Sequence, residues 1–75
     1  MIQRDTPVPP SRQLAALIRA QIDAGELAPG ARIPSIITLA ETHGVSPVTV
    51  RKGLAILKDE GLLFTVNGYG TFVRE

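Results

Sequence analysis

Apolar residues recur at steps of three and four in the first third of the chain, a spacing that places them on one stripe of an amphipathic helix. The members of this stripe are Leu14, Leu17, Ile18 and Ile22. Ser11 is the predicted N-cap, because a serine oxygen accepts hydrogen bonds from the free N–H groups of a first turn, and Gly25 ends the helix. Residues 1–10 lack this period and hold three prolines, which predicts a flexible N-terminal arm.

Two shorter helices follow in the middle of the chain. Ser35 is the predicted N-cap of the first, and Gly44 ends it with a residue suited to the left-handed conformation. Ser46 begins the second, with Pro47 at the first helical position, where the missing N–H of proline would have had no helical partner. Gly61 ends this helix. The buried stripes of the two helices are Ile36, Leu39 and Ala40, and Val50, Leu54 and Leu57.

The remaining segments predict short strands. Residues 32–34 form an extended piece between the first two helices. After the third helix, residues 62–66 are apolar and partly β-branched, and residues 70–73 supply a returning strand. Asn67-Gly68 between them is the strongest sequence signal for a two-residue hairpin turn.

The predicted fold class is therefore α+β: a winged helix-turn-helix over residues 11–75, with three helices and a C-terminal β-hairpin wing. Its predicted core consists of Leu14, Leu17, Ile18, Ile22, Leu39, Ala40, Val45, Val50, Leu54, Leu57, Leu62 and Phe72.

Composition narrows the class of protein. A chain of 75 residues has room for one domain with one small core. It has no cysteine, which excludes a disulfide framework and a thiolate zinc site and indicates a reducing, cytoplasmic setting. No segment approaches the roughly 18 consecutive apolar residues that a membrane-spanning helix needs. The net charge of +1 and a pI near 8.3 only weakly favour a polyanionic partner.

The sequence lacks the combinations of residues that catalysis requires. His43 is the single histidine, so neither a metal site nor an activated serine is expected. Gly68-Tyr69-Gly70 joins two predicted strands and opens no helix, unlike a phosphate-binding glycine loop. Asp59 and Glu60 are neighbours that point to different sides of a helix end. We therefore expect no enzyme activity, no cofactor and no metal.

Two short helices separated by residues 43–45, the second with a polar first turn, meet the requirement of a helix-turn-helix. Several motifs stand in a fixed order and spacing along the chain: Gly25-Glu26-Leu27-Ala28-Pro29-Gly30, Ile33-Pro34-Ser35, Leu39-Ala40, Gly44-Val45-Ser46, Thr49-Val50-Arg51, Leu54 with Leu57, Glu60-Gly61-Leu62, and Gly68-Tyr69-Gly70-Thr71-Phe72-Val73. With these motifs and the hairpin at its end, the chain resembles the GntR family of transcriptional regulators from about Gln13 to Val73.

The resemblance implies binding to double-stranded DNA by a homodimer, with the third helix in the major groove. Arg51 lies near the exposed start of that helix, where a guanidinium could donate two hydrogen bonds to guanine O6 and N7. Ser46 and Thr49 offer hydroxyl groups beside it, to a base or a phosphate. Lys52 and Arg12 are predicted phosphate neighbours; an exposed lysine on a helix equally needs no special role.

Other predicted DNA-binding residues lie at the ends of elements. Ser35 begins the second helix, and Pro47 with Val48 could contact a thymine methyl group. The resemblance to the family also implies that the wing tip reaches the adjacent minor groove or the DNA backbone. Its predicted contact residues are Asn67, Gly68 and Tyr69. The alternatives are that this tip serves only as a hairpin turn and that Tyr69 packs on the sheet.

The chain departs from the family pattern at three positions. Typical members carry an acidic residue and an arginine after the Pro-Ser, and another arginine after the serine of the third helix. Here Ile36, Ile37 and Pro47 occupy those places, so we expect weaker or altered DNA binding. The chain ends at Glu75, and we expect the larger C-terminal effector domain of the family to be absent.

The sequence leaves two functions open. The first is a sequence-specific transcriptional regulator, a repressor that occupies an operator as two copies. The second is a winged-helix protein-interaction module with weakened or lost DNA binding. The apolar residues Ile36, Ile37 and Ile56 favour the second, because they could form a surface for a protein partner or a second copy.

Overall fold

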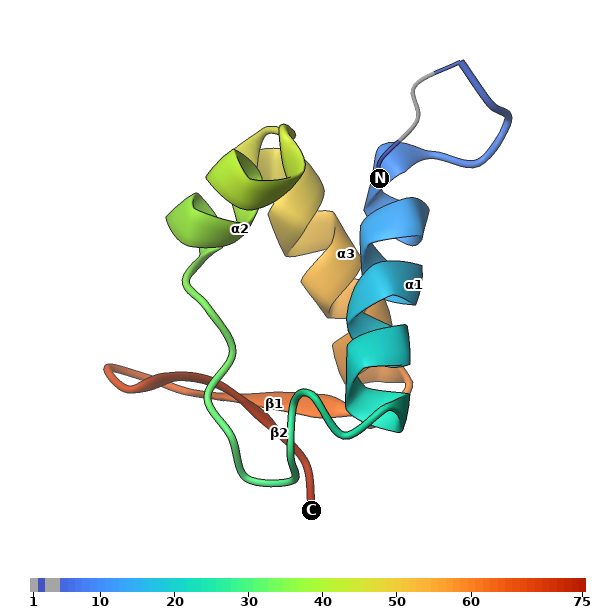
Figure 1. Cartoon of the computed structure of the whole chain (residues 1–75). Coiled ribbons are helices and arrows are strands. Elements are labelled where there is room, and N and C mark those ends of the chain that lie inside the picture. The colour runs from blue at the N-terminus through green and yellow to red at the C-terminus, as the bar shows by residue number, and fades with distance from the viewer. Residues whose placement is uncertain (1, 3–4) are drawn as a thin grey trace.

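Three helices followed by an antiparallel hairpin make up the fold, as the sequence predicts (Figure 1). A computed structural model describes residues 2 and 5–75. In chain order the elements are α1 (Pro10–Asp23), α2 (Ile36–His43), α3 (Pro47–Asp59), β1 (Leu63–Val66) and β2 (Gly70–Val73). Helices α1 and α3 pack side by side, α2 lies beside the first part of α3, and the hairpin lies at the other end of the helices.

The start of α1 differs from the prediction. The helix begins at Pro10 with Pro9 as its N-cap, and Ser11 lies inside the first turn rather than capping it. Proline suits this place because its fixed φ is helical and its nitrogen has no proton that needs a partner. Gln13 Nε2 donates hydrogen bonds to Val8 O (2.8 Å) and Thr6 Oγ1 (3.3 Å), which hold this part of the N-terminal segment against α1.

The predicted caps of α2 and α3 are confirmed. Ser35 Oγ accepts a hydrogen bond from Thr38 N, and Ser46 Oγ accepts one from Thr49 N, each at 3.1 Å. Gly44 ends α2 in the left-handed conformation. The turn between the helices is therefore only Gly44 to Ser46, which fixes the angle between α2 and α3 and sets the direction in which the start of α3 points.

The hairpin turn is longer than predicted. Val66 pairs with Gly70, so three residues connect the strands instead of Asn67-Gly68 alone. Tyr69 N donates to Val66 O (3.0 Å), and of the two residues between them only Gly68 has a positive φ. A two-residue type I′ turn needs positive φ at both central positions, whereas this arrangement meets the condition for a type II turn. Tyr69 is therefore the last residue of the turn and lies directly before β2.

The extended piece between α1 and α2 runs along β2. Ile33 N donates to Thr71 O (2.9 Å), and Val73 N donates to Ala31 O (2.8 Å). Arg32 forms an isolated antiparallel bridge with Phe72. The segment before α2 therefore anchors the hairpin to the helices, and the hairpin tip projects beyond this anchor (Figure 1).

Most of the predicted core residues are buried, but in the hairpin the buried positions differ by one residue from the prediction. The buried hydrophobic residues are Leu14, Ala15, Ile18, Ile33, Leu39, Ala40, Val45, Val50, Leu54, Leu57, Leu63 and Val73. Leu63 and Val73, which pair across the strands, take the places predicted for Leu62 and Phe72. Alternate strand residues face opposite sides, so a shift of one residue exchanges the faces.

Phe72 lies on the outer face of the hairpin. Its ring stacks on that of Phe64, with centroids 5.8 Å apart, and the guanidinium of Arg74 lies 5.6 Å from the Phe64 centroid. Leu62 is half-buried, as are Leu17 and Ile22 of α1, which were predicted as core. Of these residues, Ile22 and Leu62 pack against the edge of the core.

Gly53 allows α1 and α3 to approach closely. It is buried in α3, and a Cβ built on it would lie 2.9 Å from the backbone oxygen of Ser11 and 3.3 Å from Leu14 Cδ2. Glycine in a helix interior costs about 1 kcal/mol of stability relative to alanine. The structure shows that the missing side chain sets the distance between the two longest helices.

Substitution of Gly53→Ala should therefore destabilise the domain by about 1–3 kcal/mol in urea or thermal unfolding, because the new methyl group forces the helices apart. The control is Ala55→Gly, an exposed position in the same helix, which should cost about 1 kcal/mol through helix propensity alone. A Gly53→Ala protein that is more stable than the wild type would contradict the close approach.

Candidate nucleic-acid interface

The first two turns of α3 are open to solvent on one side. The exposed residues Val48, Arg51, Lys52 and Ala55 stand at positions i, i+3, i+4 and i+7, which share one face of a helix. The opposite side of α3 is buried against α1 and α2. A helix fixed in this way offers its outer face and its N-terminal end to a groove about the width of one helix.

The charges at this end of the molecule suit a polyanion. Neither Ile36–Thr38 at the start of α2 nor Pro47–Thr49 at the start of α3 includes an acidic side chain. A carboxylate there would have occupied the positive end of the helix dipole, which instead remains available to an external anion. Along α3, Arg51 and Lys52 lie in the first half and Asp59 at the end.

The cap of α3 leaves one hydroxyl proton available. Ser46 Oγ accepts from Thr49 N and donates to Thr49 Oγ1 (3.1 Å). Since both functions of the Ser46 hydroxyl are used, its main role is to hold the helix start. Thr49 Oγ1 accepts this bond, so its own proton can be donated to a phosphate or a base. The predicted pair Ser46 and Thr49 thus divides into a structural residue and a candidate contact.

The charge of Arg19 is compensated by an ion pair with Glu60. Its Nε donates to Glu60 Oε1 (2.9 Å) and its Nη2 to Glu60 Oε2 (2.6 Å), a two-point pair that joins α1 to the end of α3. The hydrogen bond to Glu60 raises the pKa of Arg19 above its ordinary value. In the described part of the chain, no ion pair joins Arg51 or Lys52 to a carboxylate, so both charges remain uncompensated.

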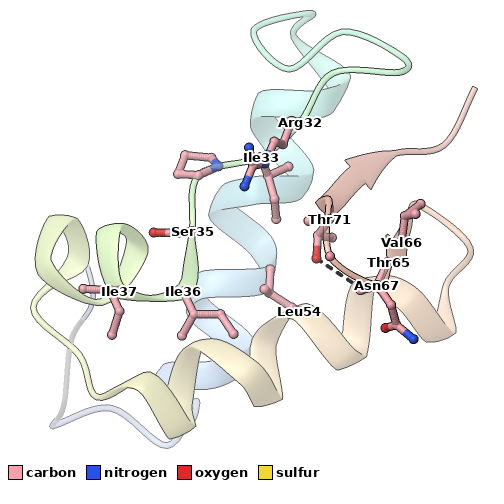
Figure 2. Close-up of a pocket in the computed structure, with 13 residues that line it drawn as sticks. Arg32, Ile33, Ser35, Ile36, Ile37, Leu54, Thr65, Val66, Asn67 and Thr71 are labelled. Carbon is pink, nitrogen blue, oxygen red and sulfur yellow. Dashed lines mark hydrogen bonds between the residues drawn. The ribbon is translucent and has the colours of Figure 1, made fainter.

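A hollow of about 440 Å³ lies between the start of α2 and the hairpin (Figure 2), and we call it the wing groove. Ile36 and Ile37 line one side, and Leu54 rises from α3 between that side and the hairpin. The complete lining is Arg32, Ile33, Pro34, Ser35, Ile36, Ile37, Leu54, Thr65, Val66, Asn67, Gly68, Gly70 and Thr71. The fold thus brings three predicted DNA-binding residues, Ser35, Asn67 and Gly68, to one hollow.

Arg32 is a candidate that the sequence prediction missed. It is exposed, lines the wing groove and passes so close to the hairpin that a Cβ on Gly70 would lie 2.6 Å from its Nε. This puts a cation against Gly70, in the hollow that Asn67 and Gly68 also line. The only local signal was a single arginine in a short extended segment, and its position depends on a pairing with β2 that is remote in sequence.

Tyr69 does not pack on the sheet. Its side chain is 70% exposed at the hairpin tip, because the three-residue connection turns it outward. The alternative in which Tyr69 covers the strands is therefore wrong. An exposed phenol at the end of a projecting hairpin can both stack and donate a hydrogen bond.

Arg12 and Ile56 lie in a different place from the wing groove. Both line a second hollow, of about 320 Å³, with Val8, Ala15, Ala16, Arg19 and Glu60. Ile36 and Ile37 line the wing groove instead, and Ile36 and Ile56 are half-buried against the core. The three isoleucines therefore line two separate hollows rather than one. Of the three, Ile37 is the one with an exposed side chain.

Two further findings concern metals and membranes. Across residues 2 and 5–75, no group of three His, Cys, Asp or Glu side chains is placed to hold a metal ion. None of the helices formed by these residues is long and apolar enough to cross a membrane.

Comparisons with known proteins agree with this geometry. Residues 10–73 match the family described as bacterial regulatory proteins, gntR family. The chain is 42% identical over 74 residues to the HTH-type transcriptional repressor NagR of Bacillus subtilis (strain 168), covering 99% of this chain and 30% of that protein. It is 45% identical over 64 residues to the repressor MngR of the mannosyl-D-glycerate transport/metabolism system of Escherichia coli (strain K12), covering 85% of this chain and 27% of that protein.

Solved structures show the same fold. The DNA-binding domain of AraR in complex with an operator has a TM-score of 0.90 and 34% identity, covering 97% of this chain and 92% of that one. YtrA from Sulfolobus acidocaldarius, a GntR-family transcription factor, has a TM-score of 0.90 and 36% identity, covering 100% and 79%. The chain thus spans most of these two chains but less than a third of the length of NagR and MngR.

Loss of the serine hydroxyl should lower the stability of the domain at Ser46, which caps α3, but not at Ser11. Ser46→Ala removes the cap of α3 and should lower the free energy of unfolding by about 1 kcal/mol, which moves the thermal midpoint of a domain this small by about 4–8 °C. Ser46→Asp keeps an accepting oxygen and should retain stability. The matched control is Ser11→Ala, which removes a serine that caps nothing and should leave the midpoint unchanged. Equal losses at both positions would contradict the assignment of caps.

Proposed function

Because the chain belongs to the GntR family of bacterial regulatory proteins, we propose that it represses transcription by occupying an operator in double-stranded DNA. The first two turns of α3 enter the major groove, and the hairpin tip contacts the adjacent backbone or minor groove. The family consists of regulatory proteins, which agrees with the prediction that the chain is not an enzyme. A target on the chromosome would place it in the cytoplasm.

One observation carries this proposal: the exposed, uncompensated cationic face of α3 at Arg51 and Lys52, in a fold with a TM-score of 0.90 to a domain bound to its operator. The buried side of α3 fixes the helix backbone in the fold, so the entropy lost on docking is mainly that of the exposed side chains. The same half of the helix has no acidic side chain to repel phosphates.

Each cation has a different proposed role. Arg51 reads a guanine, since a guanidinium at the start of a recognition helix can donate to O6 and N7 together. Lys52 and the hydroxyl of Thr49 contact phosphates beside it. Arg32 binds the backbone next to the hairpin tip, where Asn67, Gly68 and Tyr69 extend the contact. Arg12, on α1, is the most peripheral phosphate neighbour.

Fewer phosphate contacts than usual are expected. Ile37 and Pro47 stand where relatives in the family pattern carry arginine, and each missing contact removes about 0.9 from the slope of log affinity against log salt. With Arg12, Arg32 and Lys52 as the phosphate-binding cations, we expect a slope of about −3 per copy. A larger share of the affinity then comes from contacts with base edges.

We expect two copies to bind one operator with two-fold symmetry. A domain of 75 residues contacts too little DNA to select one site among the many competitors in a genome. Two copies on half-sites about one helical turn apart, or a multiple of it, double the contact area. The exposed Ile37 and the wing groove are the surfaces that could instead take a protein partner.

Three variants separate the roles on α3 in binding titrations at several salt concentrations, against a duplex selected from a random pool. Arg51→Ala should weaken binding 5- to 150-fold, equivalent to about 1–3 kcal/mol, and relax the preference at one base pair. Lys52→Ala should weaken all duplexes alike and make the salt slope shallower by about 1. Lys58→Ala, an exposed cation near the end of the same helix, is the matched control and should change neither.

Binding that is insensitive to both salt and Arg51→Ala would contradict the proposal. It would favour the second function, a winged-helix module that binds protein through Ile37 and the wing groove. In that case Ile37→Ser should abolish partner binding while Arg51→Ala leaves it intact.

The number of copies can be measured directly. Native mass spectrometry of the chain with a duplex that holds the selected site should show two chains per duplex, and a duplex cut to one half-site should show one. A saturated complex with one chain on the full site would contradict occupation by two copies.

A further inference from the structure

Val48 is an exposed aliphatic side chain at the start of α3. Its side chain is 55% exposed in the first turn of α3. The exposed large hydrophobic residues in the part of the chain that the structure describes are Val8, Ile37, Val48, Val66 and Tyr69, and of these only Val48 belongs to α3. Its methyl groups therefore lie on the face that the proposed function turns toward the bases.

Val48 lies directly beside Arg51 on that face. The two residues are three apart in the helix, on the same side, and about 4.5 Å apart along its axis. Successive nucleotides of one DNA strand are about 3.4 Å apart. A base touched by Val48 is therefore within about two base pairs of the base read by Arg51.

The chemistry of a valine limits what it can recognise. It neither donates nor accepts a hydrogen bond, so it gains nothing from a phosphate or from the donors and acceptors of base edges. The one apolar group that a base pair presents in the major groove is the 5-methyl group of thymine. The residue before Val48 adds to this character, since Pro47 offers only ring carbons at the helix start and is half-buried.

We propose that Val48, with Pro47 behind it, selects a thymine methyl group within two base pairs of the guanine read by Arg51. This rests on the proposed function and assigns part of its sequence preference to an apolar contact. The half-site then contains a guanine and a nearby thymine, and the contact survives at salt concentrations that weaken the phosphate contacts, because it involves no ion.

Replacing thymine by deoxyuridine tests the contact, because the two bases differ only in the 5-methyl group. The duplex is the one selected by the wild-type chain, and the guanine is located as the position where Arg51→Ala loses discrimination. Deoxyuridine at the neighbouring thymine should weaken wild-type binding about fourfold, the effect of removing one methyl group from an apolar contact. With Val48→Ala the same base change should cost less than twofold.

Ile37→Ala is the matched control, since it trims an aliphatic side chain of similar exposure (59%) outside α3. It should leave the fourfold thymine effect unchanged. Val48 is exposed, so Val48→Ala should keep the wild-type thermal midpoint, which separates loss of contact from loss of fold. Deoxyuridine outside the half-sites should have no effect on either protein.

The outcomes distinguish this inference from the function on which it rests. Salt-sensitive binding with no effect of deoxyuridine near the guanine, or a selected site with no thymine within two base pairs of it, overturns the role of Val48 alone. An equal penalty in the wild type and in Val48→Ala also overturns it. A wild-type chain that binds no duplex overturns the proposed function itself.

Discussion

The close packing of α1 on α3 at Gly53 is the constraint on which the rest of the structure depends. A Cβ at this position would meet a backbone oxygen at 2.9 Å, so the two helices can lie this close only because it is absent. The contact buries one side of α3 and turns the side with Val48, Arg51 and Lys52 outward. The face proposed to read DNA is thus a consequence of how the core is closed.

Much of the fold follows from local sequence. Helical periodicity, two serine caps and the Asn-Gly pair predict the elements, because each signal acts within a few residues. The errors concern effects that local patterns do not determine. Phe72 and Leu62 were assigned to the core because apolar strand residues alone do not reveal which face is buried. The start of α1 was misjudged because serine caps and proline starts compete within two residues.

The candidate site was predictable to the same extent. Residues on α3 follow from the helix and its exposed stripe, so Arg51 and Lys52 could be named in advance. Arg32 could not, since its place beside the hairpin tip depends on a pairing with Phe72, forty residues away. The three isoleucines illustrate the opposite error: together they suggested one apolar surface, whereas the fold divides them between two hollows. The face of α3 combines an exposed valine with a proline at the place where the family pattern has an arginine, and in the proposed mode of binding this would shift recognition from phosphates toward base edges.

The central claim is that the start of α3 and the hairpin tip are the parts of the chain that touch DNA. Backbone amide NMR spectra of the labelled chain, recorded during addition of the selected duplex, test it most directly. The largest shift changes should fall on residues 46–52 and 67–70, with little change in the second half of α1. Changes concentrated on α1 and the end of α3, with residues 46–52 unaffected, would contradict it.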